Sequence, residues 1–76
     1  MGSNQKKELI RIVEFMDAVQ KDIAKMGRNV ERVFEDELRH KNEEIIGLMD
    51  NIEGLFSMTE NLKNYSAELI QRFEAN

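Results

Sequence analysis

The stretch LRHKNEEI, residues 38–45, decides how the rest of the chain is arranged. Six consecutive polar residues, Arg39 to Glu44, interrupt a chain that otherwise carries an apolar residue every three or four positions. The chain either turns at this point or continues as one long helix. If it turns, its two halves can pack against each other; if it continues, each half needs a partner from another molecule.

Several residues in this stretch favour a turn. The basic run Arg39 to Lys41 would lie at the negative carbonyl end of a first helix. Asn42 is a good N-cap residue, and Glu43 and Glu44 behind it suit the positive end of a second helix. The stretch lacks glycine, the residue that most often reaches the left-handed conformation at a helix C-terminus; Asn42 adopts it less readily. We predict a turn near residues 39–44.

The apolar residues on both sides repeat every seven positions, the pattern of helices with one apolar side. The strict alternation of a half-buried strand is absent. Before the polar stretch, the two series are Leu9, Met16, Ile23, Val30 and Ile12, Val19, Met26, Val33. After it, they are Ile45, Ile52, Thr59, Ser66, Phe73 and the leucines Leu48, Leu55, Leu62, Leu69, with Phe56 beside them. The leucines have the spacing of the d positions of a coiled coil.

We therefore predict one all-α domain over residues 1–76, folded as an antiparallel, coiled-coil-like two-helix hairpin. The expected helices span about residues 6–39 and 43–74, after a frayed or tag-like end at residues 1–5. The registers of the two halves differ by one residue, which a turn accommodates without strain. Two alternatives remain open: one continuous helix in a coiled coil, and a break near Gly27 in the segment KMGRN.

Size and composition point to self-association. The chain has 76 residues and no cysteine, so its core is small and no disulfide stabilises it. The apolar stripes are wider than a single helix pair needs, so we expect two hairpins to form a four-helix bundle. The expected partners are the chain itself, as a homodimer or larger assembly, and another helical protein. The absence of cysteine fits an intracellular, cytoplasmic setting, and no apolar run has the ~18 residues that span a membrane.

These features predict a protein–protein interaction module, namely an oligomerisation, adaptor or scaffold element. It would act through an interaction core that comprises Leu9, Ile12, Met16, Val19, Ile23, Met26, Val30, Val33, Ile45, Leu48, Ile52, Leu55, Phe56, Leu62, Leu69 and Phe73. The sequence contains neither a nucleophile–base arrangement nor a glycine-rich phosphate loop. We therefore predict no catalytic residues, no enzymatic activity and no cofactor.

Two other functions can be formulated from charged residues. A basic stripe would suit RNA or DNA phosphates, although the net charge of −4 argues against nucleic acid; it consists of Lys21, Lys25, Arg28, Arg32 and Arg39. The segment ELRH places Glu37 and His40 at the Glu-x-x-His spacing of some metal-binding bundles, with Glu44 one turn further on.

Overall fold

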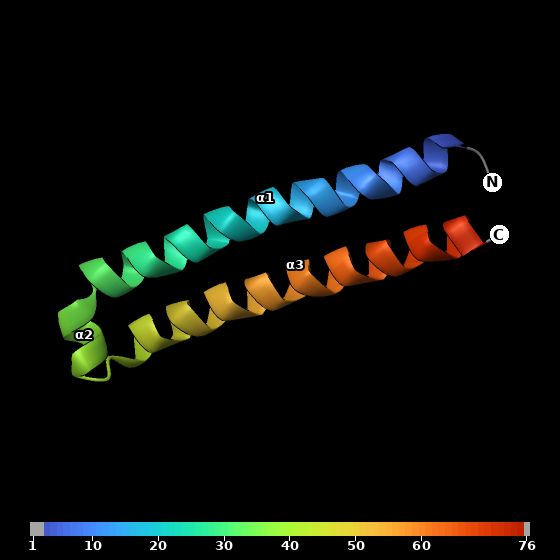
Figure 1. Cartoon of the computed structure of the whole chain (residues 1–76). Coiled ribbons are helices and arrows are strands. Elements are labelled where there is room, and N and C mark those ends of the chain that lie inside the picture. Colours follow the sequence, from blue (N-terminus) through green and yellow to red (C-terminus); the bar gives the residue numbers. More distant parts are fainter. Residues whose placement is uncertain (1–2, 76) are drawn as a thin grey trace.

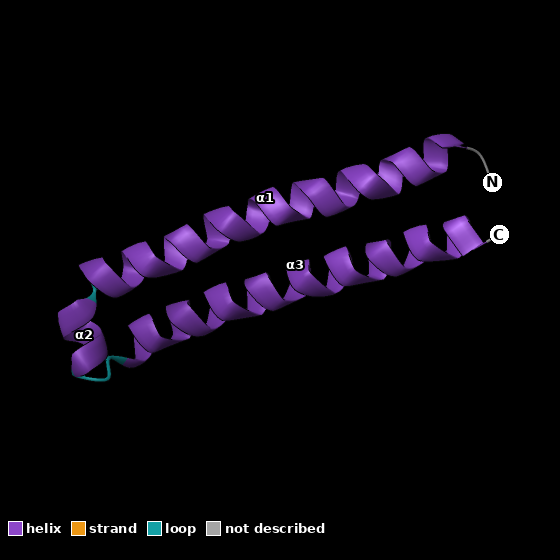
Figure 2. Ribbon diagram, viewed as in Figure 1, coloured by secondary structure: helices purple, strands orange, loops and turns teal. Residues whose placement is uncertain are grey.

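The protein is a helical hairpin. The structure, a computed structural model, describes residues 3–75 and contains α1 (Ser3–Val33), α2 (Glu35–Arg39) and α3 (Glu43–Ala75). The long helices α1 and α3 lie side by side and antiparallel, and the short α2 connects them at one end (Figure 1). The hairpin measures 55 × 15 × 13 Å. Within residues 3–75 the chain contains helices and short connections but no strand (Figure 2).

This architecture confirms the predicted all-α hairpin. The alternative of one continuous helix is wrong, and so is the break near Gly27, because α1 passes through that residue without interruption. The first helix begins at Ser3, earlier than the expected residue 6; residues 1–2 of the expected frayed end lie outside the described residues. The second helix, expected over about 43–74, spans Glu43–Ala75.

The turn is built by main-chain hydrogen bonds at the end of α2. The Asn42 N–H donates to the Glu37 carbonyl at 2.9 Å, and the Lys41 N–H donates to the Leu38 carbonyl at 3.1 Å. This pair of bonds is the Schellman motif, which requires a left-handed residue after the helix. Lys41 is that residue, with φ of 56°. The chain thus turns without glycine, and Lys41 rather than Asn42 takes the left-handed conformation.

Asn42 instead begins the second long helix. Its side-chain Oδ1 accepts hydrogen bonds from the Glu44 N–H at 3.0 Å and from the Ile45 N–H at 3.3 Å. These are two of the main-chain donors that the first turn of a helix leaves without partners. The predicted N-cap role of Asn42 is confirmed.

The first long helical segment is divided at Phe34, which separates α1 from α2. Phe34 has φ of −108° and ψ of 29°, outside the helical region. Helical hydrogen bonds nevertheless continue across it, from the Phe34 N–H to the Val30 carbonyl and from the Leu38 N–H to the Phe34 carbonyl, both at 2.9 Å. A single residue therefore redirects the chain, so that α2 crosses the end of the hairpin toward α3 (Figure 1).

On α3 the seam between the long helices is formed by the expected series that contains Ile52, and on α1 by residues in and beside the expected series that contains Ile23. Its most buried residues are Gln20, Ile23 and Gly27 on α1 and Ile52, Thr59 and Ser66 on α3. Three of these six residues, Gly27, Thr59 and Ser66, are small, which allows close approach: a Cβ on Gly27 would lie only 3.6 Å from Ile52 Cγ2. The leucine series, with the spacing of d positions, lies outside this seam.

Candidate protein-interaction surface

A polar cluster crosses one side of the seam near its middle. The side-chain amide nitrogen of Gln20 donates to Glu60, and Lys63 Nζ donates to Gln20 Oε1 at 2.9 Å. Lys63 also lies 3.8 Å from Asp17 and 3.6 Å from Glu60. The hydrogen bond from Gln20 and the charge of Lys63 hold the pKa of the Glu60 carboxyl below its ordinary value. Because both ends of the Gln20 amide have partners, this buried polar group is tolerated in the seam.

The same side of the hairpin carries a second cross-helix contact. Lys6 on α1 and Glu74 on α3 form an ion pair of 3.1 Å near the end of the hairpin that is opposite the turn. Closer to the turn, Ala24, Glu31 and Glu53 border this side. We call it the polar side because these hydrogen bonds and ion pairs cross it, although Met49 and Phe56 also line it near the turn.

The opposite side of the hairpin is apolar, and we call it the open face. Ile12 and Phe15 of α1 and Leu62 of α3 line one shallow hollow, which shows that these side chains share a side of the hairpin. Seven-residue spacing, and neighbours three or four positions away, extend this side along each helix. The open face comprises Ile12, Phe15, Val19, Met26 and Val33 of α1 and Leu48, Leu55, Met58, Leu62, Tyr65 and Leu69 of α3.

The open face leaves much apolar surface in contact with water. Leu55 and Leu62 are 44% and 45% exposed, and Phe15 is 66% exposed. Only two hydrophobic residues among those described, Ile23 and Ile52, are buried by the hairpin itself. Contiguous apolar patches of this kind mark interaction sites on soluble proteins.

The predicted interaction core is divided between the seam and the open face. Seven of its members are buried or half-buried along the seam: Leu9, Met16, Ile23, Val30, Ile45, Ile52 and Phe73. Eight belong to the open face: Ile12, Val19, Met26, Val33, Leu48, Leu55, Leu62 and Leu69. Phe56 borders the seam on the polar side, where it lines a hollow with Gly27 and Met49.

The residues of the predicted basic stripe are exposed; four of them are on α1 and Arg39 is on α2. Arg39 lies on α2 and pairs with Glu35 at 3.1 Å and with Asp36 at 3.5 Å. Lys21 pairs with Asp17 at 3.7 Å. Lys25 and Arg32 are on the outer surface of α1, whereas Arg28 borders the hollow on the polar side.

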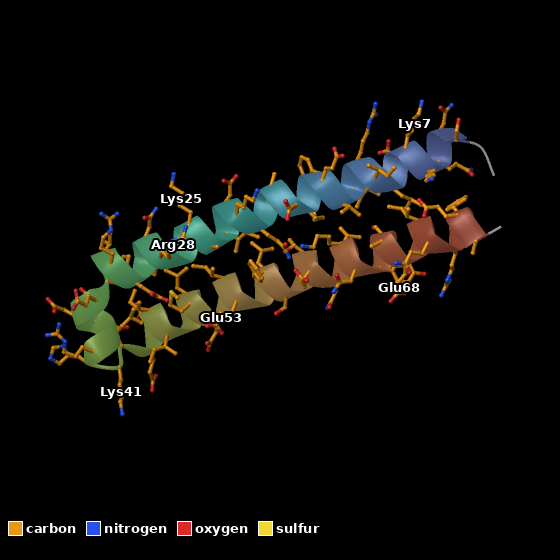
Figure 3. The ribbon with its side chains drawn as sticks, viewed as in Figure 1. Lys7, Lys25, Arg28, Lys41, Glu53 and Glu68 are labelled. Carbon is orange, nitrogen blue, oxygen red and sulfur yellow. The ribbon has the colours of Figure 1, made fainter. Side chains whose placement is uncertain are left out.

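The outer edges of the hairpin differ in charge. Lys7 and Lys25 project from α1 away from α3, and Glu53 and Glu68 project from α3 away from α1 (Figure 3). Helix α1 carries seven Lys and Arg against five Asp and Glu, and α3 carries two against seven. Each helix therefore complements the other in net charge.

The turn does not assemble the proposed metal ligands. His40 uses Nδ1 in a 2.7 Å hydrogen bond to the Asp36 carbonyl, which orients its ring along α2. Glu37 and Glu44 lie on either side of the turn, on different helices. Among residues 3–75, no three histidine or carboxylate side chains are placed to hold a metal ion.

Sequence reasoning missed several residues of these surfaces. Gln20 meets Glu60 and Lys63 across the seam although it is 40 and 43 positions from them, so local spacing contains no sign of these contacts. Met58 and Tyr65 of the open face did have a signal, because they are seven residues apart and next to the leucine series.

No helix within the described part of the chain has the length and apolar character needed to cross a bilayer. Comparison of the chain with protein-family models, curated proteins and solved structures gave no significant match.

Proposed function

We propose that this protein is a protein–protein interaction module, an oligomerisation, adaptor or scaffold element, that buries its open face against the apolar surface of a helical protein. The observation that supports this function most directly is the contrast between the two sides of the hairpin. Hydrogen bonds and ion pairs cross the polar side, whereas the open face presents exposed leucine, methionine and aromatic side chains.

The exposed leucines support this proposal because the fold of the hairpin does not require them. Burying a leucine side chain stabilises a protein by about 1.5–3 kcal/mol, but Leu55 and Leu62 obtain only part of this within the hairpin. A partner that covers the open face supplies the remainder. Such an interaction needs shape and apolar surface and uses no catalytic group.

The substitution Leu55→Glu tests this function. Because Leu55 is 44% exposed, the hairpin tolerates a glutamate there, whereas an apolar interface would have to bury the charge. We expect the wild-type chain to sediment above its monomer mass of 8.9 kDa and Leu55→Glu to sediment at that mass with its helix content retained. Circular dichroism and sedimentation equilibrium measure both properties.

The matched control is Ser57→Glu, which adds the same charge at an exposed position of α3 outside the open face. This variant should keep the mass of the wild-type assembly. If Leu55→Glu and the wild-type chain have the same mass at every concentration, the proposed function is wrong.

A further inference from the structure

We infer that a second copy of the same chain covers the open face, with a two-fold axis parallel to the helices, so that both turns lie at one end of the dimer. This inference rests on the proposed function and names the partner of the same surface. In the resulting four-helix bundle, α1 of each copy packs on α3 of the other, and all neighbouring helices are antiparallel.

The size of the open face suits a second hairpin. A surface 55 Å long and 15 Å wide covers roughly 800 Å², which is the area that each partner contributes to an interface of standard size. A second hairpin has the same length and presents the same apolar strip, so the two open faces cover each other from end to end. A hairpin that buries only two hydrophobic residues in the described part of the chain also gains stability from such additional burial.

Contacts within the hairpin define which residues lie at the same level along it. Lys6 pairs with Glu74 near the end opposite the turn, and Gly27 contacts Ile52 nearer the turn. A two-fold axis parallel to the helices keeps each residue of the second copy at the level that it has in the first. The register inside one hairpin therefore fixes the register between the copies.

This register aligns the apolar residues of α1 with the leucines of α3 from the second copy. The aligned layers include Val19 with Leu62, Met26 with Leu55 and Val33 with Leu48. All six side chains belong to the predicted heptad series; five of them are exposed in the hairpin, and Val19 is half-buried. The leucine series thus obtains in the dimer the core position that it lacks in the seam.

Charged residues that flank the open face at the end opposite the turn match in the same register, although Glu8 and Arg11 also pair with each other at 3.7 Å. Glu8 of one copy lies level with Arg72 of the second copy, and Arg11 lies level with Glu68. All four residues are exposed in the hairpin. Opposite charges across the interface favour this pairing over others and fix its register.

Two of the remaining layers pair like with like, whereas Asp22 lies level with Met58 of the second copy. Phe15 lies level with Tyr65 of the second copy, and Asn29 lies level with Asn51. The first pair brings together two aromatic side chains that are 66% and 59% exposed in the hairpin. The second pair brings together two amides, which can hydrogen-bond to each other.

The reverse orientation, with the turns at opposite ends, is less complementary. It packs α1 on α1 and α3 on α3, which places the net positive helices together and the acidic helices together. With the two hairpins overlapping along their full length, Asp22 lies beside Asp22 of the second copy near the two-fold axis. Phe15 then lies level with Asn29 instead of an aromatic partner.

A distance measurement between spin labels distinguishes the two orientations. The chain has no cysteine, so Glu43→Cys provides one label site per chain at the exposed start of α3, beside the turn. With both turns at one end, the labels lie about 20–30 Å apart, since diagonal helices of a four-helix bundle are separated by roughly 14 Å. With the turns at opposite ends, the separation is about 45 Å. Ser57→Cys, near the middle of α3, is the control, because it gives a short distance in both orientations.

A short distance for Glu43→Cys supports the inference. A long distance for Glu43→Cys with a short one for Ser57→Cys overturns the orientation and leaves the proposed function intact. If neither label gives an intermolecular distance and the mass is that of one chain, the second copy as partner is excluded.

Charge reversal provides an independent measurement. We expect Arg72→Glu to weaken dimerisation about 3- to 10-fold, because each dimer contains two such pairs and exposed pairs are individually weak. Adding Glu8→Arg to this variant should restore the affinity if the two residues face each other across the interface. If the second substitution weakens dimerisation further, the proposed register is wrong.

Discussion

Ile52 and Leu55 lie three residues apart on the same helix, yet Ile52 is 8% exposed against Gly27 and Leu55 is 44% exposed on the open face. The two residues therefore serve different purposes. Ile52 holds α1 and α3 together, whereas Leu55 is available to a partner. This separation allows the stability of the hairpin and its association to be tested independently.

Truncating Ile52 should mainly lower the stability of the hairpin, and truncating Leu55 should mainly weaken its association. Ile52→Ala removes buried methyl groups and should lower the free energy of unfolding of the monomeric hairpin by about 2–4 kcal/mol, measured by chemical denaturation at a dilute, fixed concentration. Leu55→Ala should change that stability by less than about 1 kcal/mol and should mainly weaken association. Equal losses of hairpin stability would contradict the placement of Leu55 outside the seam.

Replacing Lys41 by glycine should stabilise the turn. Lys41 has a left-handed backbone, which costs residues with a Cβ about 1 kcal/mol. Lys41→Gly should therefore raise the free energy of unfolding by about 0.5–1 kcal/mol, despite the greater freedom of glycine in the unfolded chain. The control Lys25→Gly, in the exposed interior of α1, should lower it by about 1 kcal/mol. A loss of stability at both positions would mean that the turn has another conformation.

Removing the Asn42 cap should weaken the start of α3. Asn42→Ala leaves the Glu44 and Ile45 N–H groups without their side-chain acceptor and should lower the free energy of unfolding by about 1 kcal/mol. Asn42→Asp retains an acceptor oxygen and serves as the control, with a stability close to that of the wild-type chain. Thermal unfolding followed by circular dichroism is sufficient to distinguish them.

Gly27→Ala should fit the seam and stabilise it. The new Cβ would lie 3.6 Å from Ile52 Cγ2, an ordinary van der Waals contact, and alanine favours a helix over glycine by about 1 kcal/mol. Gly54→Ala is the matched control, because a Cβ there meets nothing within 4 Å. We expect both to raise the free energy of unfolding, and Gly27→Leu to lower it through overpacking. A loss with Gly27→Ala would show that the helices approach more closely than described.

The polar cluster makes the free energy of unfolding depend on pH. The pKa of Glu60 is lowered in the folded hairpin, first by the hydrogen bond from Gln20 and then by Lys63, so the ionised carboxylate stabilises the fold. This contribution is present above the ordinary pKa of a glutamate and is lost as the pH falls through the lowered value. Unfolding of wild-type and Glu60→Gln chains between pH 7 and pH 2 measures it. Glu60→Gln should depend less on pH; identical pH profiles would exclude a role for this carboxylate.

The turn could be predicted because its signals are local. Basic residues at a helix end, Asn42 as a cap and the glutamates that follow act within a few positions of one another. The identity of the left-handed residue could not be predicted in the same way, because intrinsic preference favours Asn42 over Lys41. In the hairpin, however, the side chain of Asn42 is bonded to the start of α3, and the main-chain bonds place Lys41 after α2.

The role of the leucine series was harder to predict. Seven-residue spacing shows that residues share one side of a helix, but it does not show which neighbouring helix that side meets. The two apolar series of each half leave two choices of seam, and their spacing alone does not decide between them. The choice depends on contacts such as Gln20 with Glu60, which arise only when distant segments meet.

The ion pair between Lys6 and Glu74, at 3.1 Å, also has a consequence for the order in which the helices can be connected. It brings the start of α1 and the end of α3 close together, while the connection between the helices lies at the far end of the hairpin (Figure 1). A short linker could join the end of α3 to the start of α1, and the chain could be cut at the connection between the two helices. This change would reverse the order of the helices in the chain and preserve both the seam and the open face. The order in which the helices are synthesised is therefore not a requirement of this fold.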